Sequence, residues 1–167
     1  MAQPGSKTIL RERKAAAGDG YRAQVVFAFR QFELDNSEKA AARQLLDLIP
    51  KDDDQRLTLL TLGDALCDSE TISEMKSLAR VRDGLPQEFA RAVLLLPTSM
   101  PAYLSYSLKA VADPHDDSAI QMQVVCRKAH GEFLRAFDAL PVDDKSWYRK
   151  YIFDPEDCRA LEHPEAR

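Results

Sequence analysis

Two stretches of the chain share one pattern, EFARAVLLLP at residues 88–97 and EFLRAFDALP at residues 132–141. A third run, KAAARQLLDLIP at residues 39–50, also spaces its apolar residues as a helix does and ends on a proline. Proline has no amide hydrogen to give to a helix and disfavours helical geometry in the residue before it, so each run predicts a helix that stops at its proline. The prolines at 50, 97 and 141 lie 47 and 44 residues apart, which predicts a repeated helix–turn–helix unit.

An acid or a serine stands two residues after each of these prolines, at Asp52, Ser99 and Asp143. Side chains of these types accept hydrogen bonds from the free amides at the start of a helix. We therefore expect each of the three to cap the helix that follows it.

The rest of the chain has helical periodicity too, and no segment alternates apolar and polar residues as a half-buried strand does. The sequence therefore predicts an all-α fold, either stacked helical hairpins that resemble an α-solenoid or an irregular bundle of about nine or ten helices. The expected helices span residues 7–16, 21–34, 39–49, 52–66, 71–82, 86–96, 99–112, 118–140 and 143–152, with a short helical turn at 154–161.

The length of 167 residues allows one domain with a sizeable core. We expect a single all-helical domain over residues 1–167, with frayed ends at residues 1–5 and 163–167. The composition, 45% hydrophobic and 30% charged, is that of an ordinary globular protein. No run approaches the roughly 18 consecutive apolar residues that a membrane-spanning helix needs, so we expect no membrane span.

The net charge of −4 argues against a general nucleic-acid binder. The charge is uneven, because the first 22 residues carry five bases against two acids. A basic first helix most simply docks on the acidic remainder of the chain, and the alternative is a DNA-associated regulator that uses this helix. The charged residues of this segment are Lys7, Arg11, Arg13, Lys14 and Arg22, with Glu12 and Asp19.

The three cysteines, Cys67, Cys126 and Cys158, are odd in number and widely spaced, which does not indicate a disulfide framework. They favour buried thiols in a reducing compartment. No apolar stretch typical of a secretion signal precedes the charged residues near the N-terminus. We therefore expect a cytoplasmic protein. The alternative is the periplasm, reached with a signal peptide that was removed, where one disulfide and one free thiol would form.

Residues 15–32, AAAGDGYRAQVVFAFRQF, resemble the opening of a Sel1-type or tetratricopeptide-type helical repeat. The likeness consists of a Gly-Asp turn, an Ala-Gln pair on the first helix, an aromatic residue about two turns later and a second helix rich in alanine. It is clearest over residues 15–50, and LGDAL at residues 62–66 repeats it weakly. The proline spacing is nearer that of HEAT-type helix pairs. The resemblance implies stacked helical hairpins that bind another protein, and some small bacterial repeat proteins of these kinds neutralise secreted toxins.

Two cysteine–histidine pairs offer an alternative function, because two sulfurs and two imidazoles suit zinc. The four residues are Cys126, His130, Cys158 and His163. Cys126 lies on an apolar helical stripe, and the spacing of five between Cys158 and His163 is poor for one helix face. We therefore expect buried thiols, no metal and no cofactor. A small metal-binding helical regulator or enzyme that uses these residues is the alternative.

Candidate partner-binding residues fall into an acidic run and an aromatic group. The acidic run suits a basic partner, and interfaces favour Tyr, Trp and Arg at their energetic centres. We expect Tyr148, Arg149 and Lys150 to be exposed, and the alternative is that Trp147 and Tyr151 close the end of the core. The full set is Asp52, Asp53, Asp54, Tyr103, Tyr106, Trp147, Tyr148, Arg149 and Lys150.

The sequence contains no Gly-x-Ser-x-Gly elbow, no glycine-rich phosphate loop and no His-Glu-x-x-His pair. The repeated hairpins and the acidic composition favour a non-enzymatic protein-binding module. Its sharpest form is a bacterial immunity or adaptor protein that masks a basic toxin or effector. The identity of the partner and the oligomeric state stay open at this point.

Overall fold

The computed structural model describes residues 20–64, 72–110 and 117–160, and these residues are mostly helical. The all-α prediction is confirmed, with eight α-helices in the described ranges. The expected count of nine or ten is not reached there, while the helix expected at residues 7–16 and the expected frayed ends lie outside these ranges. The helices are α2 (Tyr21–Leu34), α3 (Lys39–Leu46), α4 (Asp53–Leu60), α5 (Ile72–Leu95), α6 (Met100–Ala110), α7 (Ser118–Lys128), α8 (His130–Asp138) and α9 (Val142–Tyr151).

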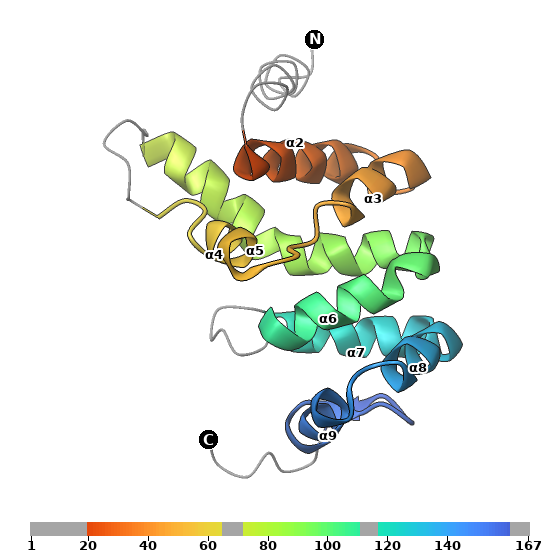
Figure 1. The fold of residues 1–167 in the computed structure, drawn as a ribbon. Coiled ribbons are helices and arrows are strands. Elements are labelled where there is room, and N and C mark those ends of the chain that lie inside the picture. Colours follow the sequence, from red (N-terminus) through yellow and green to blue (C-terminus); the bar gives the residue numbers. More distant parts are fainter. Residues whose placement is uncertain (1–19, 65–71, 111–116, 161–167) are drawn as a thin grey trace.

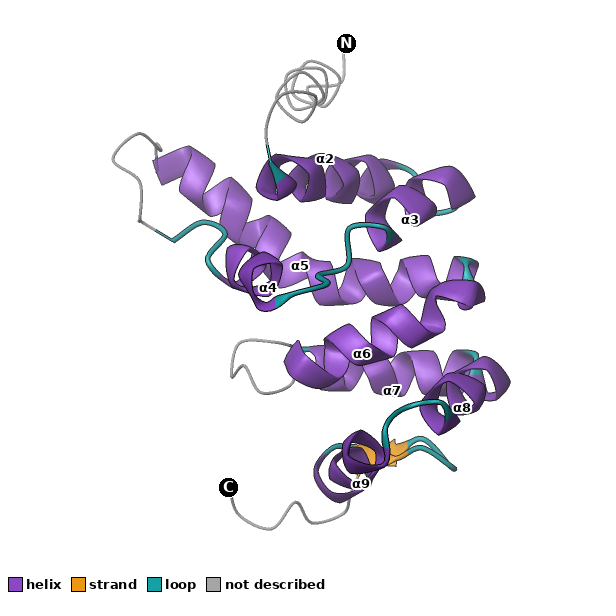
Figure 2. Cartoon of the chain, viewed as in Figure 1, coloured by secondary structure: helices purple, strands orange, loops and turns teal. Residues whose placement is uncertain are grey.

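Several helices that follow one another in the sequence also contact each other (Figure 1). α2 contacts α3 and α5, and α5 in turn contacts α6 and α7. α6 contacts α7 and α8, while α9 contacts β1 (Phe153–Asp154), which pairs antiparallel with β2 (Arg159–Ala160). α2 and α9 lie at opposite ends of the view, with α5, α6 and α7 between them. Figure 2 shows how small the β1–β2 pair is beside the helices.

One continuous cluster of buried apolar side chains extends from Val25 in α2 to Cys158 just before β2. Three residues of α2 belong to this cluster, Val25, Phe29 and Phe32, and each is at most 3% exposed. Their spacing of four and three residues places them on one side of the helix. None of the described helices combines the length and the apolar surface that crossing a membrane would require.

The sequence predicts separate helices at residues 71–82 and 86–96, and this prediction is wrong, because α5 runs through Pro86. Proline removes one helical hydrogen bond and crowds the carbonyl four residues earlier, which can bend a helix without ending it. Leu85, Pro86 and Phe89 are all buried, so core packing on this stretch offsets the lost bond. Figure 1 shows α5 bending along its length.

The opposite error occurs at residues 118–140, where one long helix is expected and the structure has two. Ala129 leaves helical geometry with φ −136° and ψ 49°, so that it ends α7 and begins α8. Its amide donates to the Val125 carbonyl at 2.9 Å, and its carbonyl accepts from the Phe133 amide at 2.8 Å. Gly131 lies just beyond the break, and glycine makes a helix easier to interrupt by about 1 kcal/mol relative to alanine.

The predicted caps are only partly confirmed. Asp52 is the N-cap of α4, and its carboxylate accepts a hydrogen bond from the Gln55 amide at 2.8 Å. Asp143 is not a cap, because α9 starts one residue earlier at Val142 and Asp143 falls within its first turn. Ser99 lies in a 3-10 turn, Pro97–Ser99, that continues into α6.

The helical turn expected at residues 154–161 is also wrong, because the chain forms the β1–β2 hairpin there. Cys158 has a φ of 57°, which places it in the left-handed region and reverses the chain before β2. The Cys158 amide donates to the Asp154 carbonyl at 2.8 Å, and this bond closes the turn.

Gly63 provides a first prediction about stability. It has a φ of 81°, and a Cβ at this position would lie 2.5 Å from the Ala79 amide nitrogen and 2.6 Å from the Met75 carbonyl oxygen of α5. Because both obstacles are backbone atoms, Gly63→Ala is expected to lower the free energy of unfolding by about 2–3 kcal/mol. Urea titration followed by circular dichroism measures the loss.

Gly131→Ala is the matched control, since a Cβ at Gly131 meets no atom within 4 Å and Gly131 lies in α8. This substitution is expected to raise the free energy of unfolding by about 0.5–1 kcal/mol. Equal effects of the two glycine substitutions would show that the close approach of Gly63 to α5 does not exist in solution.

Candidate functional site

Most of the aromatic candidates are core residues. Tyr148 is fully buried, Tyr103 is 1% exposed and Tyr106 is 7% exposed, so the expected exposure of Tyr148 is wrong. The Tyr148 ring packs edge-on against Phe137 and Phe153, with ring centroids 5.0 Å apart in each pair. Burial is the main cause that raises the pKa of the Tyr148 hydroxyl, and repulsion from Tyr103 adds to it. These three tyrosines therefore stabilise the fold and offer little surface to a partner.

The other candidates of α9 do lie at the surface. Arg149 and Lys150 are exposed, as predicted, and Trp147 is 39% exposed. The Arg149 guanidinium lies 5.2 Å from the centre of the Phe137 ring and 3.4 Å from the Glu156 carboxylate. It is Tyr148, and not Trp147, that closes the core at this end, because α9 turns position 148 inward.

The acidic candidates are all exposed at the start of α4. Asp53 and Asp54 occupy the first turn, where negative charge interacts favourably with the positive end of the helix dipole. Asp53 also lies 3.4 Å from the Arg56 guanidinium. Of the eight residues of α4, Leu59 is buried and Asp53, Asp54 and Leu57 are exposed, so this helix has one solvent-facing side.

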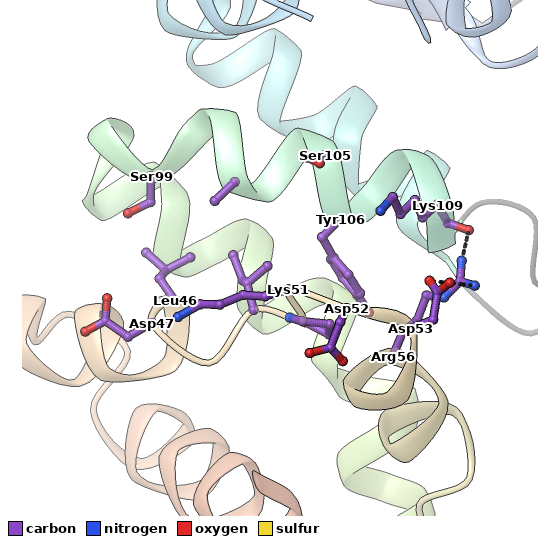
Figure 3. A pocket seen from close by; sticks show the side chains of 13 residues that line it. Leu46, Asp47, Lys51, Asp52, Asp53, Arg56, Ser99, Ser105, Tyr106 and Lys109 are labelled. Atoms are coloured by element: carbon purple, nitrogen blue, oxygen red, sulfur yellow. Dashed lines mark hydrogen bonds and ion pairs between the residues drawn. The ribbon is translucent and has the colours of Figure 1, made fainter. Parts of the chain in front are cut away.

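The structure brings part of the acidic run together with Tyr106 at one pocket of about 470 Å³ (Figure 3). The segment from Leu46 to Arg56 forms one wall, and α6 forms the other. The Tyr106 ring lines the pocket and packs edge-on against Phe89, with centroids 5.4 Å apart. The charged lining residues are three acids and three bases: Asp47, Asp52, Asp53, Lys51, Arg56 and Lys109.

Arg56 holds the two walls of this pocket together. Its guanidinium donates to the backbone carbonyl of Lys109 at 3.4 Å, next to the end of α6. The last carbonyls of a helix have no partner within the helix, so a cation placed there is favourable. The contact joins residues that are 53 positions apart, one on α4 and one on α6 (Figure 3).

Tyr21 stabilises the segment that leads into α4. Its hydroxyl donates to the Leu48 carbonyl at 2.7 Å and so connects α2 to the residues after α3. Burial raises the pKa of the Tyr21 hydroxyl, and the negative charge of Asp52 raises it further. Tyr21 therefore stays neutral and remains a hydrogen-bond donor throughout the physiological pH range.

The lining of this pocket combines hydroxyl groups with charged side chains. The hydroxyls are those of Ser99, Ser105 and Tyr106. The side chains of Lys51 and Lys109 form no ion pair with any described residue, so their charges are available to a ligand. Lys51, Arg56 and Lys109 are not among the candidate residues predicted from the sequence, because only the folded chain places them at one surface.

A second, more open groove of about 550 Å³ lies between α2 and α5. Glu88 lines it and is 6% exposed, and its Oε2 has no hydrogen-bond partner among the described residues. Burial raises the pKa of Glu88, although the Arg91 guanidinium at 2.9 Å opposes the shift. The other two acids of the groove are already paired, Glu33 with Arg80 and Asp83 with Arg82.

Three of the four residues considered as alternative zinc ligands lie close together. Cys126 and Cys158 form a disulfide, which corrects the expectation of buried free thiols and agrees with the alternative of one disulfide plus one thiol. Ligand atoms of Cys126, Cys158 and His130 all lie within 4.8 Å of one another. His163 and Cys67 lie outside the described residues.

No protein-family model matches the chain, and no curated protein or solved structure matches it either. The resemblance to Sel1-type, tetratricopeptide-type or HEAT-type repeats thus stays a prediction.

Proposed function

We propose that this chain is a non-enzymatic protein-binding module and that its partner docks on the exposed face of α4 and the pocket beside it. The observation that carries the proposal is the acidic edge, which consists of Asp47, Asp52, Asp53 and Asp54. These four acids lie with one base, Lys51, in an eight-residue segment, and all five are exposed. Such a concentration of one charge attracts a partner of opposite charge and orients its approach.

An apolar contact is available next to the acidic edge. Leu57 is 60% exposed and lies four residues after Asp53, so both occupy the same side of α4. A large exposed apolar side chain with acids around it resembles the anchor-and-rim composition of protein interfaces. The partner that fits is a protein surface with basic side chains around an apolar depression.

The helix contacts support the finer arrangement, a stack of helical hairpins. We assign the pairs α2–α3, α5–α6 and α7–α8, since the members of each pair touch. Successive pairs contact each other through α2 and α5, through α5 and α7, and through α6 and α8. Stacked pairs form extended surfaces that commonly bind other proteins.

The specific role that we propose is that of a bacterial immunity or adaptor protein that masks a basic toxin or effector. The acidic edge and the exposed Leu57 support it. The disulfide favours the periplasm over the cytoplasm as the compartment, because persistent disulfides are rare in reducing compartments.

A charge-reversal pair tests the proposal. Asp53→Lys with Asp54→Lys is expected to weaken partner binding more than about tenfold, because two attractive contacts become repulsive. The matched control is Asp143→Lys with Asp144→Lys, which reverses two exposed acids in the first turn of α9. The two variants change the charge and the helix-dipole interaction equally.

The measurement is affinity isolation with the tagged full chain from its native host, followed by titration of the recovered protein. Wild type and the α9 variant are expected to retain one protein at equal stoichiometry, whereas the α4 variant is expected to lose it. Recovery of no stoichiometric protein by wild type, or equal binding by both variants, would contradict the proposal.

A further inference from the structure

One face of α7 and the first residue of α8 hold the turn between β1 and β2. Gln123 and Arg127 both donate to the Cys158 carbonyl, at 3.0 Å and 3.3 Å. The imidazole of His130 lies 3.2 Å from the Pro155 carbonyl, and Cys126 is bonded to Cys158. Gln123, Cys126 and Arg127 follow one another at steps of three and one, which places them on one side of α7, and His130 reaches the same turn from the start of α8.

The position of Cys158 does not depend on the disulfide alone. Besides the two bonds to its carbonyl, the Cys158 amide donates to the Asp154 carbonyl at 2.8 Å. β1 is fixed by Phe153, whose buried ring packs 6.0 Å from that of Phe133 and 5.0 Å from that of Tyr148. These contacts would keep the Cys158 sulfur beside Cys126 and His130 after the sulfur–sulfur bond is broken.

The three side chains have the chemistry and the placement of a zinc site. Zinc binds thiolate sulfur at about 2.3 Å and imidazole nitrogen at about 2.0 Å in a tetrahedral arrangement, so the ligand atoms of one ion lie about 4 Å apart. The ligand atoms of Cys126, His130 and Cys158 all lie within 4.8 Å of one another while the two sulfurs are bonded, so small side-chain rotations in the reduced chain would bring them to these separations. Both cysteines are buried while His130 is exposed, so an ion could enter from the histidine side.

We propose that the reduced chain binds one zinc ion through the thiolates of Cys126 and Cys158 and the imidazole of His130. A dithiol reductant passes two electrons and two protons to the disulfide, which breaks the sulfur–sulfur bond and leaves two thiols and an oxidised reductant. Zinc then replaces the two thiol protons, which leave to solvent as two zinc–sulfur bonds form. Cys126 and Cys158 thus form a covalent link in an oxidising compartment and, together with His130, a metal site in a reducing one. This inference is independent of the protein-binding function.

Cobalt and zinc titrations of the full chain test the site. The chain is reduced under anaerobic conditions with a phosphine, which takes an oxygen atom from water as it breaks the disulfide. Cobalt is expected to bind at about one ion per chain with thiolate-to-cobalt charge-transfer absorption, and zinc is expected to displace it. The oxidised chain is expected to show no such absorption.

Three variants locate the ion. Cys126→Ser is expected to lose the charge-transfer absorption, and His130→Ala is expected to weaken zinc binding more than about tenfold. His130→Ala keeps the disulfide, so its helical content in the oxidised state shows that the variant is folded. Cys67→Ser is the matched control and is expected to bind zinc as wild type does.

The proposal is overturned if the reduced wild type binds no zinc or if Cys126→Ser binds it equally well. It is also overturned if His130→Ala binds zinc with unchanged affinity, because the site then lacks its imidazole. A reduced chain that loses its helical circular dichroism and does not regain it on addition of zinc would likewise reject the site.

Discussion

Phe133→Ala is expected to lower the free energy of unfolding by about 3–5 kcal/mol, the largest loss for any single substitution considered for this chain. Phe133 is fully buried, and its ring lies 6.3 Å from Tyr148 and 6.0 Å from Phe153. It therefore contacts α9 and β1 from α8, and its removal would leave a cavity where three elements meet. Denaturant titration with circular dichroism measures the change.

Val142→Ala is the control for Phe133→Ala, because Val142 is 72% exposed at the start of α9. A change of no more than about 0.5 kcal/mol is expected for this surface position. If Phe133→Ala also costs less than about 1 kcal/mol, the aromatic cluster around Tyr148 is not packed as described.

Removal of the disulfide has the second largest expected effect. The bond closes a loop between positions 32 apart in the sequence, and a loop of that size stabilises the folded state by about 3–4 kcal/mol through the unfolded chain. Cys126→Ser with Cys158→Ser is therefore expected to lower the free energy of unfolding by that amount under oxidising conditions. Addition of a phosphine reductant to metal-free wild type is expected to have a similar effect.

Cys67→Ser separates this effect from general loss of a cysteine. The single variant should unfold at the wild-type denaturant concentration under oxidising conditions, and it should become less stable when reduced. Equal stability of the oxidised wild type and the double cysteine variant would show that the Cys126–Cys158 bond does not form in solution.

The fold class could be predicted because it depends on local periodicity. The apolar spacing in residues 21–34 and 39–49 predicted helices close to the observed bounds of α2 and α3. The helix expected at residues 52–66 ends early, at Leu60. The wrong boundaries at Pro86 and Ala129 depend on packing between distant elements. Proline has a strong local tendency to end a helix, yet α5 continues through Pro86 because its neighbours are buried in the core. At Ala129 the residue type itself does not predict a helix end, and only the nearby Gly131 weakens the helix locally.

Only those features of the candidate site that depend on neighbouring residues in the sequence could be predicted. The cap role of Asp52 follows from its position after Pro50, and the structure confirms it. The pocket includes Arg56 and Lys109, which are 53 positions apart and meet only in the folded chain, through a hydrogen bond from Arg56 to the Lys109 carbonyl. The sequence predicts an exposed Tyr148 because protein interfaces are rich in tyrosine, but the orientation of this side chain depends on the Phe137 and Phe153 rings around it.

The half-exposed indole of Trp147 gives the molecule a built-in optical reporter. The chain has a single tryptophan, and it lies on the last helix next to the buried Tyr148. Its emission spectrum reports the surroundings of α9 alone, whereas circular dichroism averages over every helix. Coincident changes in the two would indicate all-or-none unfolding, and an earlier change in emission would reveal that the C-terminal end opens first.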